Sequence, residues 1–244
     1  LIGILQNARP CTADKLNQTL QRGNHQLVLS FEVVYEISAP LAHPAAKTNV
    51  MSLLNALEEL PIVFMHPAVD CLELQEGLAA FSAGREWMPI HPFVRRFDET
   101  VDPNARPATA IFINYPLAQT VWDLHGYGAL KGLETYAPKM KALFKSDRGL
   151  KTPPTLKAHF PTVIERQLKS CKIASTGVSL KSLADWVFIN PNRCPSLRLG
   201  FEVWHQLIKN KTDRLEDSDM EDYQHVLCVP YVDLMTLDRR MRNY

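Results

Sequence analysis

Short apolar runs alternate with amphipathic segments over the first third of the chain. Leu27-Val28-Leu29 and Ile62–Met65 are continuous apolar runs, which are typical of buried parallel strands. The pattern around them predicts helices over residues 12–22, 31–38, 49–60 and 68–81. Because strands and helices alternate, this region favours an α/β fold with a central parallel sheet flanked by helices.

The alternation ends near Trp87 and returns after Pro195. Between these residues the chain is rich in proline and contains several helical segments, so we expect a largely helical insertion. After it, the pattern predicts helices over residues 197–208 and from Asp219, and a strand over 231–237. The predicted organisation is an α/β core formed by residues 1–84 and 195–244, with residues 85–194 as a helical, basic insertion.

Composition is that of a globular protein, with 244 residues, 46% of them hydrophobic and 22% charged. No apolar run approaches the roughly 20 residues that cross a bilayer, so we expect no membrane partner. The five cysteines are widely spaced, odd in number and without a CxxC pair. This usage predicts reduced thiols and a cytoplasmic protein.

Acidic residues stand at positions where a metal site could form. Glu36 lies six residues after Ser30, in the helix that follows the first strand. Asp219 and Asp222 open a helix near the C-terminus, and the aspartates 233 and 238 flank the last predicted strand. A purely structural explanation also exists, because acids in a first helical turn complement the helix dipole and an aspartate after a strand often caps a turn.

Three segments resemble the acidic motifs of PIN-domain nucleases. Leu27-Val28-Leu29-Ser30 followed by Glu36 resembles the second motif of that family. Asp219-x-x-Asp222-x-x-His225 and Tyr231-Val232-Asp233-x-x-Thr236-x-Asp238 resemble the third and fourth, in the same order. The resemblance covers residues 1–84 and 195–244 and implies a PIN-like fold. The family's first aspartate would lie just upstream of Leu1, so we expect this sequence to lack its natural start.

The resemblance implies a nuclease that uses Mg²⁺ or Mn²⁺. Clustered carboxylates bind such hard cations, and the metal lowers the pKa of a bound water that attacks the phosphodiester. Glu36, Asp222 and Asp238 would be catalytic metal ligands. Asp219 and Asp233 would be further ligands or would orient them. Glu73, in the middle of a predicted helix, is expected to be solvated.

Positive charge is concentrated in residues 139–181. This stretch has ten Lys and Arg and two acids, a charge of +8, so the rest of the chain carries −7 because the whole is +1. A basic region beside an acidic metal site suits an enzyme that cleaves a polyanion, although a solvated helical surface would look the same. Phe144, Phe160 and Trp186 could stack on bases or belong to the core. The predicted nucleic-acid contacts are Lys139, Lys141, Lys145, Arg148, Lys151, Lys157, Arg166, Lys169 and Lys172.

The resemblance therefore implies a metal-dependent endonuclease, and RNA is expected rather than DNA because RNA is the commoner substrate in that family. The resemblance associates such proteins with bacterial toxins and antiviral defence, and with an inhibitory or activating protein partner. Two alternatives remain open. One is a catalytically silent PIN-like module that binds nucleic acid or protein, and the other is an α/β protein whose acids are structural.

Overall fold

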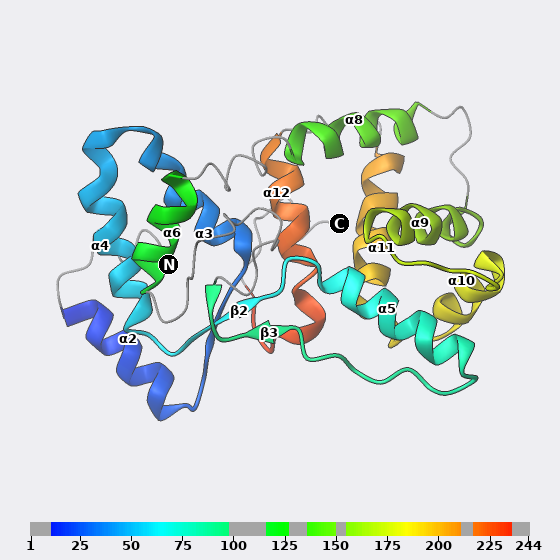
Figure 1. The fold of residues 1–244 in the computed structure, drawn as a ribbon, viewed down its shortest axis with the longest axis horizontal. Coiled ribbons are helices and arrows are strands. Elements are labelled where there is room, and N and C mark those ends of the chain that lie inside the picture. The colour runs from blue at the N-terminus through cyan, green and yellow to red at the C-terminus, as the bar shows by residue number, and fades with distance from the viewer. Residues whose placement is uncertain (1–10, 98–115, 127–135, 150–154, 211–216, 236–244) are drawn as a thin grey trace. The chain divides into compact units, whose positions relative to one another are not determined.

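The computed structural model describes residues 11–97, 116–126, 136–149, 155–210 and 217–235, and most of these are helical (Figure 1). Contacts divide the chain into two compact units. Unit 1 comprises Leu1–Pro67 and Phe93–Thr135, and unit 2 comprises Ala68–Pro92 and Tyr136–Tyr244. Each unit is therefore built from segments that are separated in the sequence.

Unit 1 contains a small mixed sheet. Its strands are β1 (Leu27–Leu29), β2 (Ile62–Met65) and β3 (Phe93–Val94), in the order β1-β2-β3. β1 pairs with β2 in parallel, as predicted, whereas β3 pairs with β2 in the antiparallel direction. The expected central parallel sheet is thus not confirmed, because among the described residues the parallel pairing is limited to β1 and β2.

The helices of unit 1 follow local sequence signals. Ser30 caps α3, where its Oγ accepts a hydrogen bond from the Val33 N–H at 3.3 Å. The apolar face of the segment predicted as 49–60 is buried in α4, where Leu54 and Leu57 are fully enclosed. The helices are α2 (Cys11–Arg22), α3 (Phe31–Ser38), α4 (Lys47–Glu58) and α6 (Leu117–Gly126), with 3₁₀ helices η1 (Ala39–Ala42) and η2 (Pro44–Ala46).

One apolar core joins the sheet and helices of unit 1. Phe97 stacks on Phe31 with ring centroids 5.3 Å apart and lies 5.6 Å from the ring of Phe64. Val121 and Leu124 of α6 are fully buried in the same core. A strand, an early helix and a helix after residue 115 therefore share one hydrophobic cluster.

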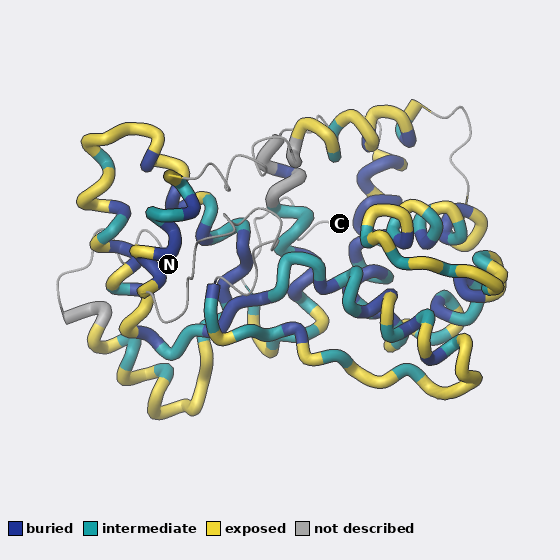
Figure 2. The backbone as a smooth tube through the Cα atoms, viewed as in Figure 1, coloured by how far each residue is buried: buried dark blue, intermediate teal, exposed yellow. Residues whose placement is uncertain are grey.

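The described part of unit 2 consists of helices packed around α11. This helix contacts α5, α8, α9, α12 and η5, and nine of its residues are buried (Figure 2). Gly77 allows α5 to approach it closely, since a Cβ there would lie 2.9 Å from Cys194 Sγ. The elements are α5 (Val69–Ser82), α8 (Tyr136–Arg148), α9 (Leu156–Ser170), α10 (Leu180–Ile189), α11 (Pro195–Lys209), α12 (Asp217–Val226) and the 3₁₀ helix η5 (Val229–Tyr231).

These contacts differ from the predicted organisation. α11 packs with α5 and with α8 and α9, which belong to the expected insertion 85–194, and α12 packs with α8. The predicted strand 231–237 is also wrong within its described part. Tyr231 ends η5 and residues 232–235 have no regular structure. Pro230 fixes its own φ near the helical value, which favours a 3₁₀ turn there.

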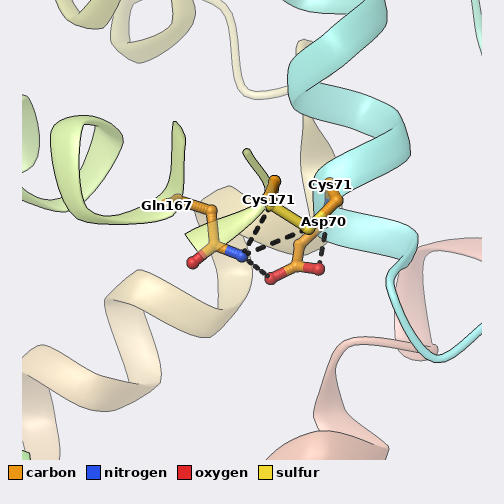
Figure 3. The surroundings of a disulfide bond; sticks show 4 residues. All are labelled: Asp70, Cys71, Gln167 and Cys171. Atoms are coloured by element: carbon orange, nitrogen blue, oxygen red, sulfur yellow. Dashed lines mark hydrogen bonds between the residues drawn. A yellow bond between two sulfur atoms is a disulfide. The ribbon is translucent and has the colours of Figure 1, made fainter. Parts of the chain in front are cut away.

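A disulfide joins two helices of unit 2. Cys71, in the first turn of α5, is bonded to Cys171, the C-cap of α9, with a Cα–Cα distance of 5.6 Å (Figure 3). Cys194 and Cys228 are buried and are not part of a disulfide. The prediction that the thiols are reduced is therefore wrong for Cys71 and Cys171. A separation of 100 residues gives no local signal for this pairing.

Candidate nucleic-acid interface

The predicted acidic site is distributed over both units. Glu36 is exposed on α3 of unit 1. In unit 2, Asp219 is buried on α12, Asp222 is half-buried one turn later, and Asp233 is exposed after η5. Asp238 lies outside the described residues. Among the residues that are described, no group of three or more His, Cys, Asp or Glu side chains is arranged to hold a metal ion.

Most of the predicted basic contacts lie on α8, on α9 or directly after α9. Lys139 and Lys145 of α8 are exposed, and so are Lys157 of α9 and Lys172 just after it. These four residues are called the basic surface below. In a helical surface such side chains extend into water, where they are available for phosphate oxygens. Lys151 lies outside the described residues.

Other predicted contacts are engaged in interactions within unit 2. The Lys169 ammonium lies 2.6 Å from the Glu165 carboxylate, one turn earlier on α9. The Arg148 guanidinium donates a hydrogen bond to the carbonyl of Asn210, at the end of α11. Lys141 is half-buried. These side chains fit a role in helix packing as well as in binding.

Arg166 connects α9 to a buried carboxylate on α8. Its two terminal nitrogens donate to the two oxygens of Asp147 at 2.9 and 3.1 Å. The Trp204 indole N–H of α11 donates to the same carboxylate at 3.1 Å. The Asp147 side chain is only 4% exposed, so its charge requires these partners. This centre holds together three helices, two of which carry the basic surface.

Two histidines lie in the same region and are buried among aromatic rings. His159 of α9 packs edge-on against Phe201, with ring centroids 5.6 Å apart, and His205 lies 6.2 Å from that ring. Burial lowers the pKa of His159, although the charge of Asp147 opposes the shift. A neutral histidine enclosed in this way belongs to the core. The same is true of Phe144 and Phe160, which are fully buried and cannot stack on a base.

Glu73 is a polar centre that the sequence prediction missed. It is completely buried on α5, and its carboxylate accepts hydrogen bonds from the Ser196 and Leu197 N–H groups, both at 2.9 Å. The Tyr231 hydroxyl donates a third bond at 2.6 Å. The expectation that Glu73 is solvated is wrong. The sequence did contain a signal, because Val69, Glu73 and Gly77 recur every four residues along one helix face.

The position of Glu73 explains why a buried carboxylate is tolerated. Ser196 and Leu197 belong to the first turn of α11, whose N–H groups have no partners within their own helix. The carboxylate satisfies two of them and complements the helix dipole. Burial raises the pKa of Glu73, and the bonds from Tyr231, Leu197 and Ser196 act in the opposite direction. Glu73 therefore anchors α5 to α11 and η5.

Comparisons with known proteins find no match. No protein-family model matches the chain, and neither curated proteins nor solved structures are significantly similar to it. In the described part of the chain, no helix has both the length and the apolar character needed to cross a membrane.

Proposed function

We propose that the chain binds RNA and that the basic surface of unit 2 contacts the phosphates. The observation that carries this proposal is the exposure of four lysines on or next to two helices that one buried centre holds together. They are Lys139 and Lys145 of α8, Lys157 of α9, and Lys172 just after α9. Lysines on packed helices keep their relative positions, so that several phosphates can be bound at once. RNA is favoured over DNA because the PIN-domain resemblance implies an RNA substrate.

Charge reversal on α8 tests this proposal. Lys139→Glu with Lys145→Glu should raise the dissociation constant for a labelled single-stranded RNA by about tenfold or more at 0.1 M salt. It should also flatten the dependence of binding on salt, since fewer counterions are released. The matched control is Lys15→Glu with Lys209→Glu, which changes the net charge equally at exposed lysines outside the basic surface. If both double variants weaken RNA binding equally, the effect comes from net charge alone and the proposal is overturned.

A second candidate function is hydrolysis of the bound RNA with Mg²⁺ or Mn²⁺. It is supported by the ordered acidic motifs, and by α12, which carries Asp219 and Asp222 on a helix as the third motif requires. Glu36, Asp222 and Asp238 would be the catalytic carboxylates, with Asp219 and Asp233 as further ligands. Metal bound there would lower the pKa of an attacking water. A toxin or defence effector of this kind would require an inhibitory or activating partner.

Cleavage of labelled RNA and DNA with Mg²⁺, Mn²⁺ or EDTA tests this candidate. Metal-dependent cutting should be lost in Asp222→Asn and in Asp238→Asn, and should persist in the control Asp185→Asn on α10. Cutting that survives both substitutions would reject the assigned carboxylates. RNA binding without cutting under any of these conditions would instead favour the silent module.

A further inference from the structure

A cavity of about 100 Å³ lies within unit 2, between α5, α8, α9, α11 and the segment from α12 to η5. Its walls are mostly apolar, and Phe201 and Trp204 of α11 contribute aromatic rings. Three polar groups line it besides one arginine, namely Asp70, Gln167 and Tyr223. An apolar cavity with a few convergent polar groups is the usual form of a small-molecule site.

Asp70 is held in one orientation at the wall of this cavity. One carboxylate oxygen accepts the Cys71 N–H at 2.9 Å, and the other accepts the Gln167 side-chain amide at 2.5 Å (Figure 3). The same Gln167 nitrogen lies 3.4 Å from Cys171 Sγ. The disulfide thus ties the residue next to Asp70 to the turn of α9 that carries Gln167, which fixes both hydrogen-bond partners of the carboxylate.

Within the described part of the chain, the Asp70 carboxylate has hydrogen bonds but no counterion. Among the described residues, none of the salt bridges involves it. Burial raises the pKa of Asp70 to about 6, so the group is largely ionised at pH 7.5 although its environment disfavours the charge. A cation bound beside it would relieve that cost.

Arg166 also lines the cavity, but its charge is already compensated. Both of its terminal nitrogens bond to Asp147, so the guanidinium is held toward that carboxylate. A ligand cation is therefore left with Asp70 as its partner. Phe201 and Trp204 also line the cavity, and aromatic rings attract cations at their π faces.

We propose that this cavity binds a small primary ammonium with a short apolar body, whose NH₃⁺ group donates to Asp70. An apolar cavity of about 150 Å³ holds one benzene molecule, so a cavity of about 100 Å³ fits a ligand of roughly four to five heavy atoms. The apolar body would contact Leu197 and Val163, and the ammonium would be oriented by Asp70 and Tyr223. Ligand binding at Asp70 in this cavity does not depend on RNA binding.

Three small probes of similar size and different charge test whether binding depends on the charge of the ligand or on its shape. n-Butylammonium, 1-butanol and butyrate are titrated into the full-length, oxidised protein at pH 7.5, with the tryptophan indole N–H signals recorded by NMR. The chain has four tryptophans, and Trp204→Phe assigns the signal at the cavity. We expect the ammonium to bind about tenfold or more tightly than the alcohol, and butyrate to bind least. Equal binding of ammonium and alcohol would overturn the proposal.

Two variants test whether the probes bind in this cavity and through Asp70. Asp70→Asn keeps the shape and should remove the preference for the ammonium while 1-butanol still binds, whereas Asp185→Asn on α10 should keep it. A preference that persists in Asp70→Asn would overturn the role of the carboxylate. Val163→Phe fills the cavity and should abolish binding of both probes. If the probes still shift the Trp204 signal in this variant, the ligand lies elsewhere and the proposal fails.

Discussion

The Tyr231 hydroxyl donates a 2.6 Å hydrogen bond to the carboxylate of Glu73, although 158 residues separate the two in the sequence. Glu73 also accepts two N–H groups from the first turn of α11. One side chain thus links α5, α11 and η5, with no solvent exposure. Its carboxylate joins segments from both ends of unit 2.

Removing the Glu73 side chain should destabilise the protein strongly. Glu73→Ala leaves two backbone N–H groups and a tyrosine hydroxyl without their acceptor, and each buried unpaired group costs about 1–3 kcal/mol. We expect the free energy of unfolding to fall by about 3 kcal/mol or more in urea titrations. Gln75→Ala, at an exposed position of the same helix, is the control and should change it by less than about 0.5 kcal/mol. Similar losses in both variants would contradict the anchoring role.

Reducing the disulfide should also destabilise unit 2. The bond closes a loop of 100 residues, for which chain entropy gives about 4–5 kcal/mol of stabilisation. We expect the midpoint of unfolding to fall when a reductant is added, and Cys71→Ser with Cys171→Ser to reproduce the fall. The paired variant should then be insensitive to reductant. Peptide mapping without reductant that recovers Cys71 and Cys171 as separate thiols would contradict the pairing.

The ionisation of Asp70 should make stability depend on pH. Burial raises its pKa from 3.8 to about 6, so its contribution to stability is complete below pH 3.8 and is lost as the pH rises through about 6. The stability of the wild type relative to Asp70→Asn should therefore fall by roughly 2–3 kcal/mol between pH 4 and pH 8. Denaturant titrations of both proteins across this range measure the difference. A constant difference, or one that rises with pH, would contradict the shift.

Asp147→Asn should weaken the packing of α8, α9 and α11. The substitution removes the charge that pairs with Arg166 and leaves an amide where the guanidinium needs an acceptor. We expect a loss of about 2–4 kcal/mol in the free energy of unfolding, together with a change in Trp204 fluorescence. Glu165→Gln breaks the solvent-exposed pair with Lys169 and should leave stability unchanged within error. If Trp204 fluorescence is unaltered in Asp147→Asn, the Asp147 carboxylate does not hold α8, α9 and α11 together as described.

The helices and strands that depend on residues close together in the sequence agree with the sequence prediction. Ser30 caps α3, the apolar face of α4 is buried, and the runs at β1 and β2 pair in parallel. Caps and helical periodicity involve residues within about four positions of one another, so the chain encodes them locally. The C-terminal strand was predicted from an apolar run that begins at Tyr231, but Tyr231 instead ends the 3₁₀ helix η5, which contains Pro230.

The candidate site could be predicted less well from the sequence than the helices and strands. The acidic residues were grouped by motif order. In the structure, the described ones lie on α3 of unit 1, on α12 of unit 2, and just after η5 of unit 2. Arg166 looked like a phosphate contact, and it bonds instead to Asp147 on the preceding helix. Charge and spacing in the sequence indicate which residues could bind a ligand. They do not indicate which other residues each side chain contacts in the folded protein.

The sequence by itself determined the helices predicted outside residues 85–194, the two parallel strands and the basic character of the segment that forms α8 and α9. Tertiary structure decided that Glu73 is buried, that Cys71 is bonded to Cys171, and that Asp70 lines a cavity. The physical reason is the range of the interactions. Backbone hydrogen bonds and helical faces arise between near neighbours, whereas burial, disulfide pairing and the environment of a charge depend on helices brought together from distant parts of the chain.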